Sequence, residues 1–195
     1  MEQTIKTIQT MYERTSIRKY QARPVEREVI DALLQAGVQA PCGGNTQFWK
    51  FLVLESDEAK YRLNLAVRDG MRDLVLGENP YKSKVSGKRA AQNDDYCCFF
   101  HAPVWIIVAN YKTHPNAMAD TTLAVSNIMH AATAMGLGTC WVNQVPWTQD
   151  DPRVKAVLQE FGLTDEHVVC ASLSLGYPDH APKKPERKAP DAMYL

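Results

Sequence analysis

The chain has 195 residues, 45% of them hydrophobic and 23% charged, and its 22 basic side chains balance 22 acidic ones. Because the formal net charge is zero, no overall field favours binding to nucleic acid or to an acidic membrane surface. The longest apolar run, residues 102–109, is much shorter than the roughly 20 residues of a bilayer-spanning helix, so we expect no membrane segment. Length and composition favour one globular domain over residues 1–195.

The five cysteines make an odd number, and residues 1–20 lack the continuous apolar core of a secretory signal. We therefore expect reduced thiols and a cytoplasmic location.

The first half of the chain shows patterns typical of helices and one strand. Apolar residues at helical spacing predict a short helix that ends near Glu13 and a second helix over residues 25–38. Aromatic and branched residues predict a strand over residues 48–56. Asp57 is a candidate cap for a third helix, which is interrupted at Gly70.

The polar stretch over residues 77–96 is predicted to be a mobile segment or a partly helical lid rather than part of the core. The next strand, residues 102–111, is apolar almost throughout, which indicates burial on both faces. The helix over residues 120–135 carries many small side chains, which favours a central or interface position, and Gly136 is its expected C-terminal cap.

A strand over residues 138–145, a helix over residues 151–162 and a strand over residues 167–178 complete the pattern, followed by a proline-rich tail expected to lie extended over a surface. The alternation of helices and strands favours a mixed α/β or α+β three-layer sandwich. The strong strands are too few for a doubly wound sheet of this length.

The segment "RTSIR" could bind an oxyanion. If it is extended, Arg14, Ser16 and Arg18 project to the same side, because side chains alternate along a strand. Two guanidinium groups and a hydroxyl suit a phosphate. The spacing alone leaves open a solvated connection whose arginines pair with surface carboxylates.

The stretch "APCGGNTQFW" could contact a ring. Gly43 and Gly44 allow the backbone to approach a ligand closely, while Asn45 and Gln47 each offer a donor and an acceptor. That combination suits a heterocycle edge such as the flavin pyrimidine ring. The alternative is a helix-to-strand turn with Asn45 in a left-handed conformation.

Other motifs in the sequence give weaker indications of function. The chain has no phosphate loop and no GxGxxG fingerprint. Cys97, Cys98 and His101 lie close together, but no second Cys/His pair stands at zinc spacing, so we expect no metal site. Cys140 and Cys170 lie in predicted strands, which favours small buried apolar residues.

Taken in order, several segments resemble the FMN-dependent nitroreductase family: "RTSIRKY", "APCGGNTQFWKFLV", "GLGTCWVNQV", "LSLGYPD" and a basic, proline-rich tail. The resemblance covers nearly the whole chain. It implies an α+β fold, namely a nitroreductase-like three-layer α/β/α sandwich with a mainly antiparallel central sheet. It also implies a homodimer with two FMN sites at its interface and a C-terminal tail exchanged onto the partner.

The resemblance implies a phosphate end of the FMN site. Arg14 and Ser16, with Thr15 between them, match the residues on the phosphate side. Arg18 matches the basic residue near flavin N1 and O2, where it would stabilise the anionic reduced flavin. Arg187 matches the arginine in the tail that helps to bind phosphate.

The remaining residues of the implied site surround the flavin ring. They are Pro41, Cys42, Gly43, Asn45, Gln47, Trp141, Val142 and Asn143. The 41–47 group would come from across the dimer, and residues 141–143 would place backbone against the ring and its N5. Cys42 replaces the usual serine, which leaves a redox thiol beside the flavin open, and Phe48 replaces the usual proline.

The implied activity is that of an FMN-dependent oxidoreductase. Electrons would pass from NAD(P)H through flavin N5 to nitroaromatic, quinone or similar acceptors by a ping-pong mechanism, and no catalytic side chain is expected because the chemistry belongs to the cofactor. Three alternatives remain open: another flavin reaction on the same scaffold, such as reductive dehalogenation, a non-catalytic FMN-binding or sensing module, and a dimeric scaffold that has lost cofactor binding.

Overall fold

The computed structural model describes residues 2–181 and 184–194. A four-stranded sheet with the order β1-β2-β4-β3 forms its centre, and each neighbouring pair is antiparallel. The strands are β1 (Lys50–Leu54), β2 (Val104–Tyr111), β3 (Gly138–Trp141) and β4 (His167–Gly176). The helices are α1 (Glu2–Glu13), α2 (Arg27–Val38), α3 (Asp57–Asp73), α4 (Lys82–Ala90), α5 (Ala117–Ala134), α6 (Gln144–Thr148) and α7 (Pro152–Glu160), with a 3-10 turn η1 (Gly43–Asn45).

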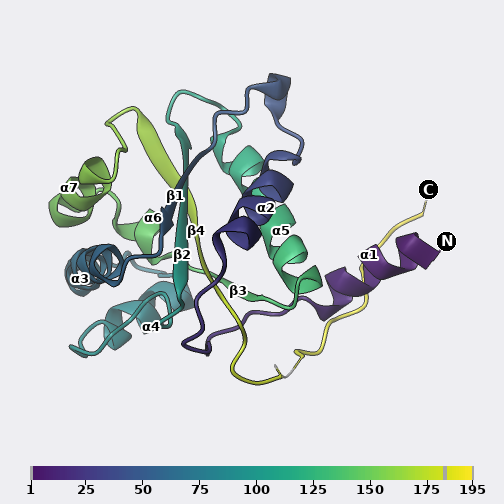
Figure 1. Ribbon diagram of the computed structural model, residues 1–195. Helices are drawn as coiled ribbons and strands as arrows, with labels where there is room; N and C mark the ends of the chain where they lie inside the picture. The colour runs from purple at the N-terminus through teal and green to yellow at the C-terminus, as the bar shows by residue number, and fades with distance from the viewer. Residues whose placement is uncertain (1, 182–183, 195) are drawn as a thin grey trace.

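Helices cover both faces of the sheet (Figure 1). The helices α3, α6 and α7 lie on one face, and α2 and α5 lie on the other. This is the antiparallel α+β sandwich that the sequence predicts.

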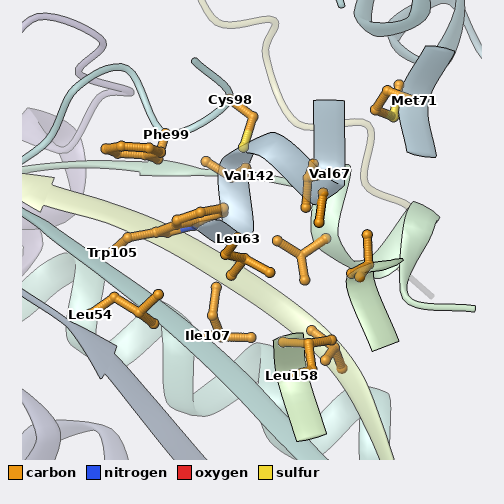
Figure 2. Packing of buried hydrophobic residues seen from close by; sticks show 14 of the residues in the cluster. Leu54, Leu63, Val67, Met71, Cys98, Phe99, Trp105, Ile107, Val142 and Leu158 are labelled. Atoms are coloured by element: carbon orange, nitrogen blue, oxygen red, sulfur yellow. The ribbon is translucent and has the colours of Figure 1, made fainter. Parts of the chain in front are cut away.

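The strand β2 is buried on both faces, as its apolar run predicts. Trp105 and Ile107 belong to the core cluster under α3, whereas Ile106 and Val108 belong to the cluster under α2 and α5. This split follows from the alternation of side chains along a strand. In the first cluster, Trp105 stacks on Phe99 with ring centroids 4.9 Å apart (Figure 2).

Two predicted elements differ in the structure. The third helix runs without interruption through Gly70, and its cap is Ser56 rather than Asp57, because the Ser56 hydroxyl accepts the N–H of Ala59. The strand expected over residues 138–145 ends at Trp141, and α6 begins three residues later. Proline is tolerated in the first turn of a helix, so Pro146 favours the helix over a continued strand.

The segment predicted as a lid contains α4 and is held firmly against α3. Arg72 donates to the carbonyls of Ala91 and Gln92 and pairs with Asp94 at 2.7 Å. Lys88 donates from α4 to carbonyls at the end of α3, including that of Arg72 at 2.7 Å. Of the two expected forms, a mobile segment or a partly helical one, the structure shows the partly helical one.

The tail has no helix or strand in its described residues, and both the tail and α1 project away from the sheet (Figure 1). Pro182 and Lys183, which belong to the stretch expected to be extended, fall outside the described residues. In the part of the chain that the structure describes, no helix is long and apolar enough to cross a membrane.

We predict that Gly138→Ala destabilises the fold by about 1–3 kcal/mol, because the new Cβ would lie 2.5 Å from Cγ1 of Ile17. The matched control is Gly77→Ala, whose Cβ would meet no atom within 4 Å. It should be neutral or slightly stabilising. Urea unfolding of both variants measures the difference, and equal midpoints would contradict the close contact between Gly138 and Ile17.

Candidate functional site

The segment 14–18 lies against the edge of β3. Ser16 forms a parallel bridge with Thr139, and the N–H of Ile17 donates to the Thr139 carbonyl at 2.9 Å. Ile17 is buried, so it faces the core. The hydroxyl of Tyr20 donates to the Ile17 carbonyl at 2.7 Å and fixes the end of the segment. The chain here is extended, as the phosphate hypothesis requires.

The residues expected at the phosphate end, Arg14, Ser16 and Arg18, all lie near the thiol of Cys140. Burial raises the pKa of Cys140, and Arg18, a hydrogen bond with Ser16, and Arg14 all act in the opposite direction. A charge interaction of this kind requires proximity, so Arg14, Ser16 and Arg18 gather around Cys140 on β3. Thr15 is half-buried between them.

The two arginines have no counter-charge. Within the described ranges, the guanidinium groups of Arg14 and Arg18 form no ion pair and donate no hydrogen bond, whereas that of Arg62 pairs with Glu160. Neither guanidinium pairs with a surface carboxylate of the described residues, and two such groups suit an oxyanion.

Residues 141–143 follow directly along β3. The ring N–H of Trp141 donates to Oδ1 of Asn143 at 2.6 Å. Val142 is buried in the core, and its N–H and carbonyl both bond to Ser172, at 2.8 and 2.7 Å. Trp141 and Asn143 are half-buried, so these two residues offer the surface that a ring could contact.

The loop of residues 41–47 holds a strained backbone. Asn45 and Gln47 have φ of 52° and 51°, in the left-handed region that side chains other than glycine rarely adopt. Their amides bond to each other, from Nε2 of Gln47 to Oδ1 of Asn45 at 3.1 Å. Pro41 is exposed and Cys42 is a half-buried free thiol. Strain of this kind gathers at binding sites, although the left-handed turn that the sequence leaves open is also present.

The loop is anchored by a buried carboxylate that sequence reasoning missed. The N–H of Gly43 donates to both oxygens of Asp120 at 3.2 Å, and Nε2 of His114 lies 2.7 Å from the same carboxylate. The ring of Phe48 packs edge-on against His114. Gly43 and Asp120 are 77 positions apart, so no local pattern connects them.

One protomer does not bring the two halves of the predicted site together. The loop with Gly43 is attached near the start of α5, whereas Ser16 is bridged to β3, which follows the end of α5 (Figure 1). The part of α5 between Asp120 and its end at Ala134 is roughly 21 Å long, which sets the scale of the separation. Arg187 is exposed in the tail and forms no hydrogen bond or ion pair with the described residues.

Two further findings concern possible metal ligands and the state of the cysteines. Over residues 2–181 and 184–194, no group of three His, Cys, Asp or Glu side chains could hold a metal ion. All five cysteines are free thiols.

The chain is an α+β sandwich, and the segment of residues 14–18 beside its edge strand β3 carries two guanidinium groups without carboxylate partners among the described residues. The model of the nitroreductase family matches residues 11–177, and the chain belongs to that family.

Similar proteins agree with this assignment. A nitroreductase from Bacteroides fragilis NCTC 9343, solved with bound FMN, has a TM-score of 0.86 and 28% identity over 97% of this chain and 98% of its own. A nitrobenzene nitroreductase from Ectopseudomonas oleovorans is 26% identical over 87% of this chain and 85% of its own. An iodotyrosine deiodinase from Thermotoga neapolitana is 25% identical over 90% of both chains.

We predict that Asp120→Ala lowers the free energy of unfolding by about 1–3 kcal/mol, because the partly buried N–H of Gly43 and the ring of His114 lose the buried carboxylate. Asp120→Asn keeps one acceptor oxygen and should lose less. The control is Asp31→Ala, an exposed carboxylate, which should change little. Urea denaturation ranks the three, and an Asp120→Ala variant as stable as the control would refute the anchor.

Proposed function

We propose that the protein is an FMN-dependent oxidoreductase that accepts electrons from NAD(P)H and delivers them to nitroaromatic, quinone or similar acceptors. FMN is the cofactor of this family member, in line with the FMN-bound relative from Bacteroides. The observation that carries the proposal is the pair of unpaired arginines, Arg14 and Arg18, beside Ser16 on the edge of β3.

Each of these side chains has a binding role in the proposal. Arg14 and Ser16 hold the phosphate, while Arg18 places a positive charge near the ring. At about 4 Å and an effective dielectric constant of 20, one such charge pair contributes on the order of 4 kcal/mol before desolvation is subtracted. When bound, FMN supplies the redox chemistry, so no side chain needs to act as a general acid or base.

We propose that each site is shared by two protomers. Residues 41–47 lie too far from Arg14 within one chain to meet the same ligand, as the length of α5 requires. A second protomer can bring its own loop to the first protomer's arginines in a two-fold dimer. The tail extends away from its own sheet (Figure 1), and in this proposal it carries Arg187 to the partner.

Exposed apolar side chains support the dimer. Several large hydrophobic residues of α1 and α5 are exposed, and these two helices contact each other. They are Ile8, Met11, Tyr12, Met118 and Leu123. If these side chains form one apolar surface, that surface is typical of a protein interface.

Reductive dehalogenation is the second candidate reaction. The similarity to the Thermotoga iodotyrosine deiodinase favours it over other flavin reactions. A turnover assay with a halogenated phenol and a nitroaromatic compound, both with the reduced protein, separates the two reactions. A non-catalytic FMN-binding module would react with neither acceptor.

The test of the proposal begins with the visible absorption spectrum of the purified protein. We expect a flavin spectrum that is bleached by NADH or NADPH without oxygen and restored by a quinone or a nitroaromatic compound. A flavin spectrum that no nicotinamide donor bleaches would favour the binding module. A colourless protein that refuses added FMN would overturn the proposal. The free thiols suit the reducing cytoplasm that we propose as its location.

Arg14→Ala should weaken FMN binding by about 10- to 100-fold, because it removes a charge-assisted contact with the phosphate. Cys42→Ser should leave FMN binding unchanged or improve it, because a hydroxyl is the better hydrogen-bond partner. Fluorescence titration of the apoproteins with FMN measures both constants. An unchanged affinity in the arginine variant would remove the phosphate assignment.

Mixed dimers test the shared site. Arg14→Ala and the double variant Asn45→Ala/Gln47→Ala should each bind FMN poorly alone. After the two are unfolded and refolded together, about one quarter of the sites should recover, because half of a two-fold mixture is heterodimer and each heterodimer holds one intact site. Equilibrium dialysis with FMN counts the sites. No recovery in the mixture would place the whole site within one protomer.

A further inference from the structure

The turn of residues 97–101 carries unusual backbone strain. Phe100 and His101, two consecutive residues, have φ of 59° and 53°. A bulky side chain in the left-handed region is an outlier that persists only where the surroundings enforce it. The N–H of His101 donates to Sγ of Cys97 at 3.1 Å, which closes the turn on itself.

Two side chains of α3 enforce this turn from behind. Lys60 is almost fully buried, and its ammonium donates to the Pro103 carbonyl at 2.8 Å. One helical turn later, Asn64 accepts the N–H of Cys98 at 2.9 Å and donates to the Tyr96 carbonyl at 2.8 Å. Residues four apart share one face of a helix, so Lys60 and Asn64 hold the backbone on both sides of the turn from the same face of α3.

At this strained turn the rings of Phe99 and Phe100 point in different directions. Phe99 turns into the core, where it stacks on Trp105 (Figure 2). Phe100 lies beneath the guanidinium of Arg18, with Cζ of Arg18 5.7 Å from the ring centroid. That distance falls within the range of a cation–π contact.

Arg18 is exposed, and among the described residues its guanidinium forms no ion pair and no hydrogen bond, so the ring of Phe100 is its packing partner. A long, unpaired side chain would otherwise sample many rotamers. A cation held in place before charge develops stabilises that charge better than one that must reorganise.

We propose that Phe100 is a positioning residue, which holds Arg18 over the flavin end of the site and thereby favours the reduced form of FMN. The inference rests on the proposed function. It adds to that function a device that sets the redox balance of the cofactor, built from the strained turn and the two α3 side chains behind it.

The alternative is a purely structural role, since Phe100 also packs at the border of the core cluster around Trp105. A structural role predicts a loss of stability after substitution with no change in the redox balance. A positioning role predicts a change in that balance which depends on the presence of Arg18.

The experiment measures the ratio of reduced to oxidised FMN in the loaded protein, equilibrated anaerobically with a reference dye at fixed potential. Phe100→Leu should lower this ratio about fivefold, on the scale of one cation–π contact. Phe100→Tyr keeps the ring and should stay near the unmodified protein. Tyr61→Leu, which removes an exposed ring on α3 that makes no contact with Arg18, is the control and should change nothing.

A double-variant comparison completes the test. Arg18→Gln should lower the ratio by at least as much as Phe100→Leu, and adding Phe100→Leu to it should cause no further loss. The same loss in both backgrounds, or an unchanged ratio in Phe100→Leu, would overturn the inference. Phe100→Met serves with the same criteria where the leucine variant does not fold. An unmodified protein that binds no FMN would instead reject the proposed function.

Discussion

The docking of residues 14–18 onto the edge of β3 is the interaction on which the candidate site depends. The bond from Ile17 to Thr139 sets the register, and Ile17 then fills the space that Gly138 leaves open. Tyr20 fastens the segment a second time, because its hydroxyl lies 2.8 Å from that of Ser174 on β4. Burial raises the pKa of Tyr20, so this phenol stays neutral and available as a donor. These contacts therefore fix the backbone from which the side chains of Arg14 and Arg18 extend.

Backbone strain marks the same regions that carry the candidate chemistry. Among the described residues, the left-handed positions other than glycine are Asn45, Gln47, Phe100 and His101. The first pair lies in the loop fixed by Asp120, and the second pair lies in the turn beside Arg18. Such conformations cost about 1–3 kcal/mol each, so the surrounding contacts must offset them. Both turns have those contacts: a buried carboxylate behind one and a buried ammonium behind the other.

Local patterns in the sequence predicted the parts of the molecule that local forces determine. The apolar run of β2, the alternation in residues 14–18 and the Gly136 cap each depend on near neighbours in the chain. The anchor between Gly43 and Asp120 and the contact between Arg18 and Phe100 depend on tertiary packing, which leaves no periodic trace. The helix α6 was missed for a related reason, since "WVNQV" favours a strand by composition alone.

The length of α5 has a thermodynamic consequence for the proposed dimer. If half of the ligand's contacts come from each chain, occupancy and association are linked equilibria, and each strengthens the other. Dilution would then release the yellow cofactor without any change to the residues that touch it. Conversely, a cell that is short of flavin would hold more of this protein as separate subunits with their apolar helices uncovered.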